Sequence, residues 1–420
     1  MKQYITNLKG NATKHKSLIQ NFSFLSALFA FNILIPLISY PYLIRILGKE
    51  IYGLVVFSQS AINYLAILVS FGFNISATKE ISIHRNNKQK LSEIVSSVLL
   101  IKCYLFLLSW ALLALLIFLI PQTRGHETIF MLSMTACLNE VLFPVWYFQG
   151  IEQMKYLTYI TVISRSIFLL LIFLIIHAPQ DYLYVPIIYG IGYLIAGVIA
   201  LFIIFFKHGI RFSFQPIRTL RYYFKDSIPI FISNLSTNLY SSTNKVIIGT
   251  YMGMGEVAYY DLAEKLTSLM KIPQAIFNQS ILPKISKDKN IHFVKQMFKI
   301  SLALNIFLLI ILVIFSKVVI LLLGGEDMLP AQLVISILAL TLPIIAMSNT
   351  FGIQILLPFG YNKVFSKIIV AAALVYLLQL ILIWICFGFS IINISLVTLS
   401  TEIITAGYLY YFCKKNKLWV

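Results

Sequence analysis

The chain has 420 residues, of which 59% are hydrophobic and 11% are charged, and its mean hydropathy is +0.87. Soluble globular domains carry roughly a quarter charged residues, so this composition excludes them and indicates an integral membrane protein. The formal net charge of +18 does not indicate nucleic-acid binding, because the basic residues are spread through short loops, as the positive-inside rule predicts.

Apolar runs of about 20 to 27 residues follow one another along the chain, and a helix needs about 20 residues to cross a bilayer. The runs cover residues 22–44, 51–73, 94–120, 128–150, 157–178, 182–206, 227–250, 256–281, 300–323, 331–357, 364–388 and 390–412. We therefore expect an all-α integral membrane protein with twelve transmembrane helices.

The polar stretch 1–21 has no short apolar core with a small-residue cleavage site behind it, so we expect no removable signal peptide. The four cysteines, Cys103, Cys137, Cys386 and Cys413, show no CxxC spacing and accompany no histidine cluster. We therefore expect no disulfide framework, no metal site and no cofactor.

The loops divide sharply by charge. With the N-terminus inside, 24 Lys and Arg residues lie on the inner side, and three, Arg45, Lys49 and Arg124, lie on the outer side. Because basic loops stay in the cytoplasm, both termini are expected to be cytoplasmic.

One short segment occurs twice: FNISATKEIS (73–82) returns as FNQSILPKIS (277–286). Each copy follows an expected helix, the second and the eighth, and LGKEIYG (47–53) and MGMGEVAYY (252–260) fall at the corresponding preceding turns. Six helices separate the copies, and an even number of crossings preserves direction, so we expect two parallel six-helix halves. The expected domains are a cytoplasmic segment 1–21, a first half 22–206, a cytoplasmic linker 207–226, a second half 227–412 and a cytoplasmic tail 413–420.

Polar side chains follow one face of two expected helices. The seventh helix carries Asn234, Asn238, Ser241 and Lys245, and the eighth carries Asp261, Glu264, Lys265, Ser268 and Lys271. The first two helices show weaker stripes, which include Asn63. Because an unpaired charge in hydrocarbon is costly, these faces are expected to line a central cavity. Pro36, Pro41 and Pro273 offer bending points or static kinks.

Bases outnumber acids within the expected spans. The bases are Lys102, Arg165, Lys245, Lys265, Lys271 and Lys317, and the acids are Glu140, Asp261, Glu264 and Glu402. A positive surplus favours an anionic ligand over a cationic drug, with Lys245, Lys271, Lys265, Arg165, Lys102, Asn234, Asn238 and Asn63 as candidate substrate-binding residues.

The acids allow two interpretations. Glu140, Asp261, Glu264 and Glu402 are candidates for ion coupling, because burial favours the neutral form of a carboxyl group. The alternative is structural: Asp261 and Lys265 neutralise each other at i, i+4, and Glu140 pairs with Arg165 or Lys102. Lys317 lies close enough to a helix end to extend into the headgroup region.

Three segments carry a family resemblance. PYLIRILGKEIYG (41–53) resembles a signature of the polysaccharide-biosynthesis exporters, and FPVWYFQGIEQMKY (143–156) resembles one of Wzx-type O-antigen flippases. NKVIIGTYMGMGEVAYYDLAEKL (244–266) resembles the corresponding segment of the second half. Members commonly have an acid where this sequence has Asn244, so no coupling role of that acid carries over. The aromatic residues of WYFQG allow sugar stacking or an interfacial belt.

The resemblance implies a MATE-like member of the multidrug/oligosaccharidyl-lipid/polysaccharide flippase superfamily in the bacterial inner membrane. Its implied activity is to move an undecaprenyl-pyrophosphate-linked oligosaccharide repeat unit, O-antigen or a related surface polysaccharide, to the outer leaflet by alternating access. The expected partners are the lipid-linked substrate and the bilayer, and a polysaccharide polymerase and a chain-length regulator are further candidates.

Two other functions remain open. One is a different transporter of the same superfamily, either an exporter of another lipid-linked glycan or an ion-coupled multidrug extruder. The other is a membrane polymerase or glycosyltransferase, which the short outer loops and the lack of a nucleotide, metal or nucleophile motif disfavour. We therefore expect a transporter and not an enzyme.

Overall fold

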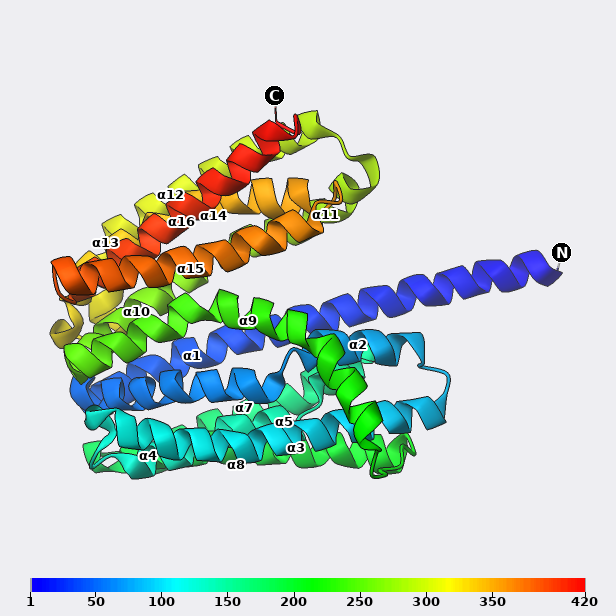
Figure 1. The fold of residues 1–420 in the computed structure, drawn as a ribbon, viewed down its shortest axis with the longest axis horizontal. Helices are drawn as coiled ribbons and strands as arrows, with labels where there is room; N and C mark the ends of the chain where they lie inside the picture. The colour runs from blue at the N-terminus through cyan, green and yellow to red at the C-terminus, as the bar shows by residue number, and fades with distance from the viewer. Residues whose placement is uncertain (1, 420) are drawn as a thin grey trace. The chain divides into compact units, whose positions relative to one another are not determined.

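The computed structural model describes the backbone of residues 2–419, and side chains in that range except those of residues 2–30, 32, 33, 122 and 239–241. Every regular element of this backbone is helical (Figure 1), which confirms the all-α prediction. The first elements are α1 (Lys2–Ser70), α2 (Phe73–Ile83), α3 (Lys88–Leu119), η1 (Pro121–Thr123), α4 (Glu127–Ser133), α5 (Thr135–Leu142), α6 (Val145–Gly150), α7 (Met154–Ile175), η2 (Pro179–Leu183), α8 (Tyr184–Phe202) and η3 (Ile203–Lys207). The others are α9 (Ile217–Tyr251), α10 (Met254–Met270), α11 (Ile272–Asp288), α12 (Ile291–Leu323), η4 (Glu326–Met328), α13 (Ala331–Ala339), α14 (Thr341–Ser348), η5 (Asn349–Leu356), α15 (Asn362–Cys386) and α16 (Ile391–Lys415).

Nine helical segments of the described chain are long and apolar enough to cross a membrane, and the protein is a multi-pass membrane protein. One of them, Leu34–Ile83, is 50 residues long and contains the end of the first expected span, from residue 34, and the whole of the second. Two expected spans fall outside the nine. One lies in α9 and the other in α10 and α11, and charged and amide side chains interrupt the apolar sequence of both. The nine segments are consistent with twelve crossings, and the count of twelve stays a prediction.

The two predicted turns whose sequences are similar each contain a glycine at the break in the helix. Gly48 has φ 73° and ψ 164° and interrupts α1, while Gly253 has φ 126° and ψ 167° and precedes α10. Both conformations are ones that side chains rarely adopt, which explains glycine at these positions. The chain therefore breaks its helices in the same way at both turns. Pro273 follows the break between α10 and α11, whereas α1 continues through Pro36 and Pro41.

The described chain packs as two compact units, one of Met1–Tyr42 with Ile62–Ile232 (unit 1), the other of Leu43–Ala61 with Ser233–Val420 (unit 2). In unit 1, α8 packs against α5 and α7, α5 against α3, and α2 against α6. In unit 2, α16 packs against α13, α14 and α15, and α12 against α13 and α14. The predicted domain boundaries, which follow the repeat and not the packing, stay a prediction.

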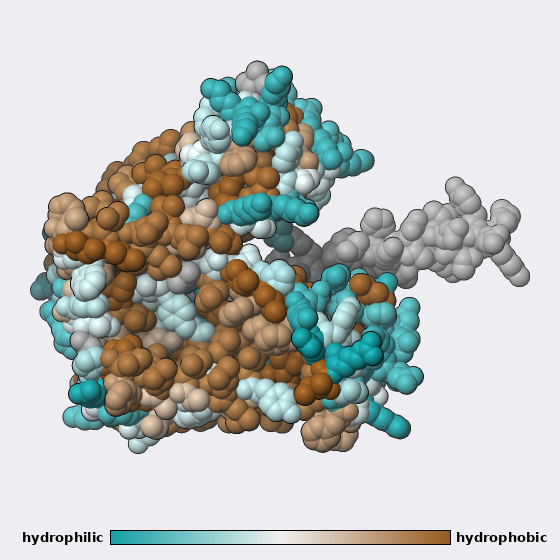
Figure 2. Space-filling model, viewed as in Figure 1, coloured by the Kyte–Doolittle hydropathy of each residue, from teal (hydrophilic) through white to brown (hydrophobic). Residues whose placement is uncertain are grey.

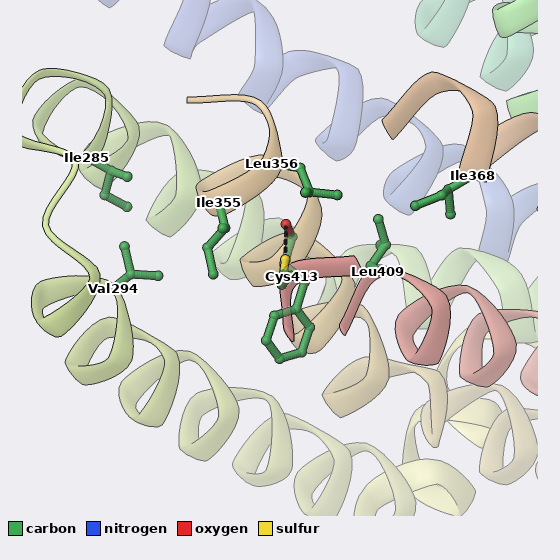
Figure 3. Packing of buried hydrophobic residues seen from close by; sticks show 8 residues of the cluster. Ile285, Val294, Ile355, Leu356, Ile368, Leu409 and Cys413 are labelled. Atoms are coloured by element: carbon green, nitrogen blue, oxygen red, sulfur yellow. Dashed lines mark hydrogen bonds between the residues drawn. The ribbon is translucent and has the colours of Figure 1, made fainter. Parts of the chain in front are cut away.

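The core of unit 2 is apolar where α11, α12, η5, α15 and α16 meet. Figure 3 shows the cluster, which consists of Ile285, Val294, Phe351, Ile355, Leu356, Ile368, Leu409 and Cys413. The thiol of Cys413 donates a hydrogen bond to the carbonyl oxygen of Phe351 at 3.5 Å. Burial of these side chains stabilises the packing of these helices against one another.

The surface follows the pattern of a membrane protein. Figure 2 shows apolar side chains over α15 and over α3 and α8, and hydrophilic side chains at the ends of the helices. Exposed side chains on these helices include Leu107 at 64% and Ile385 at 70%. Such continuous apolar surface is compatible with lipid and not with water.

The aromatic residues of the WYFQG segment lie in the interior of unit 1. Trp146 and Phe148 are fully buried and Tyr147 is 1% exposed. Gly150 allows this packing, because a β-carbon there would lie 2.5 Å from Ile81 Cγ2 of α2. In this structure the segment is therefore neither an interfacial belt nor a platform for sugar stacking. Its side chains instead contribute to the packing of α6 against α2.

Candidate functional site

The polar faces of α9 and α10 meet in a cluster of four charged side chains, here called the charge cluster: Lys245, Asp261, Glu264 and Lys265. Lys245 Nζ lies 2.9 Å from Asp261 Oδ1 and 2.6 Å from Glu264 Oε2. Lys265 forms an ion pair with the other carboxylate oxygen of Asp261. The i, i+3 and i, i+4 spacings place Asp261, Glu264 and Lys265 on one face of α10, and α9 brings Lys245 against it.

Tyr52 completes the charge cluster from the second half of α1. Its hydroxyl donates to Asp261 Oδ2 at 2.9 Å and accepts a hydrogen bond from Lys265 Nζ at 2.8 Å. Lys265 Nζ also lies 5.4 Å from the centre of the Tyr52 ring, within the range of a cation–π contact. The sequence analysis did not identify Tyr52 as a site residue, although it belongs to the LGKEIYG segment.

The charge cluster is neutral, because it contains two bases and two acids. Its four side chains differ in how far they are exposed. The side chain of Asp261 is 3% exposed, that of Lys245 16%, that of Glu264 24% and that of Lys265 34%. Asp261 is therefore the buried acceptor that both lysines share. The other three side chains are partly exposed, so a ligand that reaches them can compete with Asp261 and Glu264 for the lysines.

Asn244 lies beside the charge cluster and is fully buried. Its amide nitrogen donates to Tyr260 OH at 2.6 Å and to Thr398 Oγ1 at 2.9 Å, and its oxygen accepts from Tyr376 OH at 2.6 Å. An acid at this position would lack the amide donor that Tyr260 and Thr398 use. The hydrogen bonds thus fit the neutral side chain that this sequence has.

Two further candidates, Lys271 and Glu402, lie in unit 2. Lys271 lies at the break between α10 and α11, and Glu402 of α16 lies within electrostatic range of it. No ion pair joins either residue to another described side chain. Asn234 and Asn238 lie one turn apart on α9, where the Asn238 amide donates to the Asn234 carbonyl at 2.8 Å. The side chain of Ser241 lies outside the described residues.

The remaining candidates lie in unit 1. Lys102 is 1% exposed, and its ammonium group donates to the backbone carbonyl of Glu140 at 2.7 Å and lies 3.6 Å from its carboxylate. Arg165 and Glu140 both lie within electrostatic range of Tyr193. Asn63 is partly buried on α1. The structure thus joins Lys102 to Glu140, one of the two predicted pairings.

A second polar group of unit 2 escaped the sequence analysis. Gln274 and Asn278 of α11, Ser301 and Asn305 of α12, and Gln354 of η5 are all buried and hydrogen-bonded to one another. Gln274 accepts from Ser301 at 2.8 Å and from Asn305 at 2.7 Å. Only the i, i+4 spacing of Gln274 and Asn278, and of Ser301 and Asn305, was visible in the sequence.

No three His, Cys, Asp or Glu side chains of the described residues come together in a way that would hold a metal ion. The four cysteines are free thiols, of which Cys137 and Cys413 are buried.

Known proteins resemble this chain over nearly its whole length. A protein from Escherichia coli (strain K12) named "Putative O-antigen transporter" is 30% identical over 415 residues, which cover 97% of this chain and 99% of that protein. A protein of the same name from Shigella dysenteriae is 27% identical over 83% of this chain and 88% of its own length. Both names describe transporters, in agreement with the prediction of a transporter and not an enzyme.

Two solved structures share the fold. The lipid II flippase MurJ in an inward closed conformation gives a TM-score of 0.76 at 17% identity, covering 94% of this chain and 87% of that one. An outward-facing multidrug resistance MATE family transporter of the MOP superfamily gives a TM-score of 0.60 at 13% identity, covering 96% and 95%. The MATE-like fold predicted from the sequence is thereby confirmed.

The family follows from the sequence match itself. The model of the family described as polysaccharide biosynthesis protein matches residues 18–289 of this chain. That range contains all three segments on which the predicted resemblance rests. The chain belongs to the polysaccharide biosynthesis protein family, as its sequence motifs predicted.

Proposed function

We propose that this protein moves an undecaprenyl-pyrophosphate-linked oligosaccharide repeat unit, of O-antigen or a related surface polysaccharide, from the cytoplasmic to the outer leaflet of the inner membrane by alternating access. The observation that carries the proposal is the charge cluster, which places two ammonium groups among membrane helices. A pyrophosphate offers such groups charge-assisted hydrogen bonds that replace lost hydration. The named relatives, called O-antigen transporters, support the substrate class.

The paired acids give the proposed site a resting state. Without substrate, Asp261 and Glu264 hold Lys245 at 2.9 and 2.6 Å, and the two acids and two bases of the charge cluster balance one another. An arriving pyrophosphate competes for Lys245 and Lys265, and the released carboxylates become free to take up a cation or a proton. Lys271, which has no ion pair among the described side chains, adds positive charge on the same helical segment. The exchange of partners is what would couple substrate binding to a change of conformation.

The same observation weighs against the other functions. Organic cations would find Lys245 and Lys265 repulsive, so multidrug extrusion is disfavoured, whereas another lipid-linked glycan carries the same phosphate chemistry. A polysaccharide polymerase and a chain-length regulator are the partners expected to use the product on the outer side.

The test uses a variant that keeps the charge cluster neutral. Lys245→Gln combined with Glu264→Gln removes one ammonium and one carboxylate, so the protein should remain folded while its affinity for pyrophosphate falls. We expect a drop of at least about tenfold in surface polysaccharide restored to a flippase-deficient strain, since a charged hydrogen bond contributes about 1.5 to 3 kcal/mol. Lys271→Ala should also impair export.

Lys317→Ala provides the control, because Lys317 is exposed near the end of α12 and its loss should leave export unchanged. If the double variant and Lys271→Ala both restore polysaccharide as well as the parent, these lysines do not bind the substrate.

The proposed direction of transport requires both termini and the segment 207–225 to face the cytoplasm. Single cysteines at Ser213 and Asp327, both exposed, test this after replacement of the exposed Cys103 and Cys386. An impermeant thiol reagent added to intact cells should label Asp327→Cys and leave Ser213→Cys unlabelled until the cells are opened. Labelling of Ser213→Cys from outside would reverse the topology.

A further inference from the structure

Three lysines of unit 1 gather around one tyrosine and one histidine at the ends of three helical segments. Lys155 Nζ and Lys207 Nζ each lie 5.1 Å from the centre of the Tyr156 ring. Lys88 Nζ lies 3.7 Å from the position that a β-carbon on Gly209 would take, one residue beyond His208. We call Lys88, Lys155 and Lys207 the lysine triad.

No acid compensates the lysine triad. None of its three residues forms an ion pair with a described side chain. Glu152 precedes Lys155 by three residues, but its carboxylate lies 3.1 Å from the guanidinium group of Arg85. Burial and the charges of Lys207, Lys88 and Lys155 lower the pKa of His208, whose Nδ1 lies 3.0 Å from Tyr147 OH. Like charges gathered in this way repel one another, so a bound anion would stabilise the arrangement.

The lysine triad lies where a membrane surface is expected. Lys88 begins one of the segments able to cross the membrane, Lys155 is the second residue of another, and Lys207 ends a third. Beside these lysines, Tyr159 is 57% exposed, Phe202 58% and Phe206 76%. Tyr159 lies one turn from Lys155 on α7, and the rings of Phe202 and Phe206 are stacked 5.0 Å apart.

We propose that the lysine triad binds the phosphate of an anionic phospholipid, whose acyl chains lie along Tyr159, Phe202 and Phe206. Cationic groups at headgroup level, with exposed aromatic and apolar side chains next to them, match the two ends of such a lipid. A free inorganic anion would use the lysines alone. This site is distinct from the charge cluster, and its failure would leave the proposed transport function unaffected.

The test measures retained lipid by native mass spectrometry on the full-length protein purified with phosphatidylglycerol. Replacing Lys88, Lys155 and Lys207 together by Gln should reduce bound phosphatidylglycerol by at least about tenfold, since each basic residue near a membrane surface contributes appreciably to anionic lipid binding. The triple Arg variant keeps the charge and should retain the lipid. Phosphatidylcholine, which is zwitterionic, should bind the parent weakly.

A matched triple variant, Lys287→Gln, Lys289→Gln and Lys363→Gln, changes net charge equally at exposed lysines of unit 2 and should retain lipid as the parent does. Equal lipid retention by the triad variant and this control would overturn the proposal. So would displacement of phosphatidylglycerol by millimolar inorganic phosphate, because the site would then recognise a free anion.

Discussion

Replacing Asp261 by Asn is expected to destabilise the protein more than any other single change in the charge cluster. Asp261 is 3% exposed and accepts from Lys245, Lys265 and Tyr52 at once. The amide keeps the size of the side chain but removes its charge, so two ammonium groups share the single carboxylate of Glu264. Removing one partner of a buried ion pair costs about 3 to 5 kcal/mol. Thermal unfolding in detergent should show the loss, and export should fail with it.

Asp327→Asn is the matched control, because Asp327 is exposed in η4 and forms no ion pair with a described side chain. It should unfold at the same temperature as the parent. Adding Lys265→Gln to Asp261→Asn restores neutrality and should recover much of the lost stability. A single variant that unfolds like the parent would mean that the charge cluster contributes nothing to folding.

Much of the fold could be predicted from the sequence, because the bilayer imposes a length and an apolar composition on each helix. The turns at Gly48 and Gly253 were predictable from their similar neighbours, and both adopt conformations that favour glycine. The subdivision of one predicted span into α4, α5 and α6 was not, since it depends on the packing of α6 against α2.

The contacts within the charge cluster could be predicted only between residues that are neighbours on one helix. Asp261, Glu264 and Lys265 share a face of α10 by spacing alone. Tyr52 lies 209 residues away from Asp261 in sequence, and no periodicity indicates that contact. The surplus of bases also looked larger in the sequence than in the structure, because tertiary contacts pair Lys245 and Lys102 with acids.

The repeated segment shows how similar sequences acquire different roles. Both copies follow a helical break, after Ser70 and after Met270. Ser76 is buried and its hydroxyl lies 2.6 Å from that of Ser227, whereas Ser280 is exposed. Asn278, in the second copy, belongs to the buried amide group around Gln274. The two copies therefore differ in the contacts of their side chains and in their distance from the helical break, since the first begins at Phe73 and the second at Phe277.

The pair of Lys102 and Glu140 allows a separation of structural and coupling roles, because its two members differ in burial. Lys102 is 1% exposed and Glu140 27%. Glu140→Gln leaves a buried ammonium group without a carboxylate and should cost about 3 to 5 kcal/mol of stability. Lys102→Met leaves the carboxylate that is the more exposed member of the pair, so its cost should be smaller. The order of the two unfolding temperatures tests this asymmetry.

The double variant Lys102→Met with Glu140→Gln removes both charges and should recover stability, since apolar replacements of buried pairs are often neutral. If the pair is structural, as we expect, this variant also restores surface polysaccharide, and Glu326→Gln, which changes an exposed acid, behaves like the parent throughout. Restored stability without export would contradict a purely structural role. It would instead assign a role in transport to Glu140 or Lys102, because a pair that only stabilises the fold is dispensable once both charges are gone.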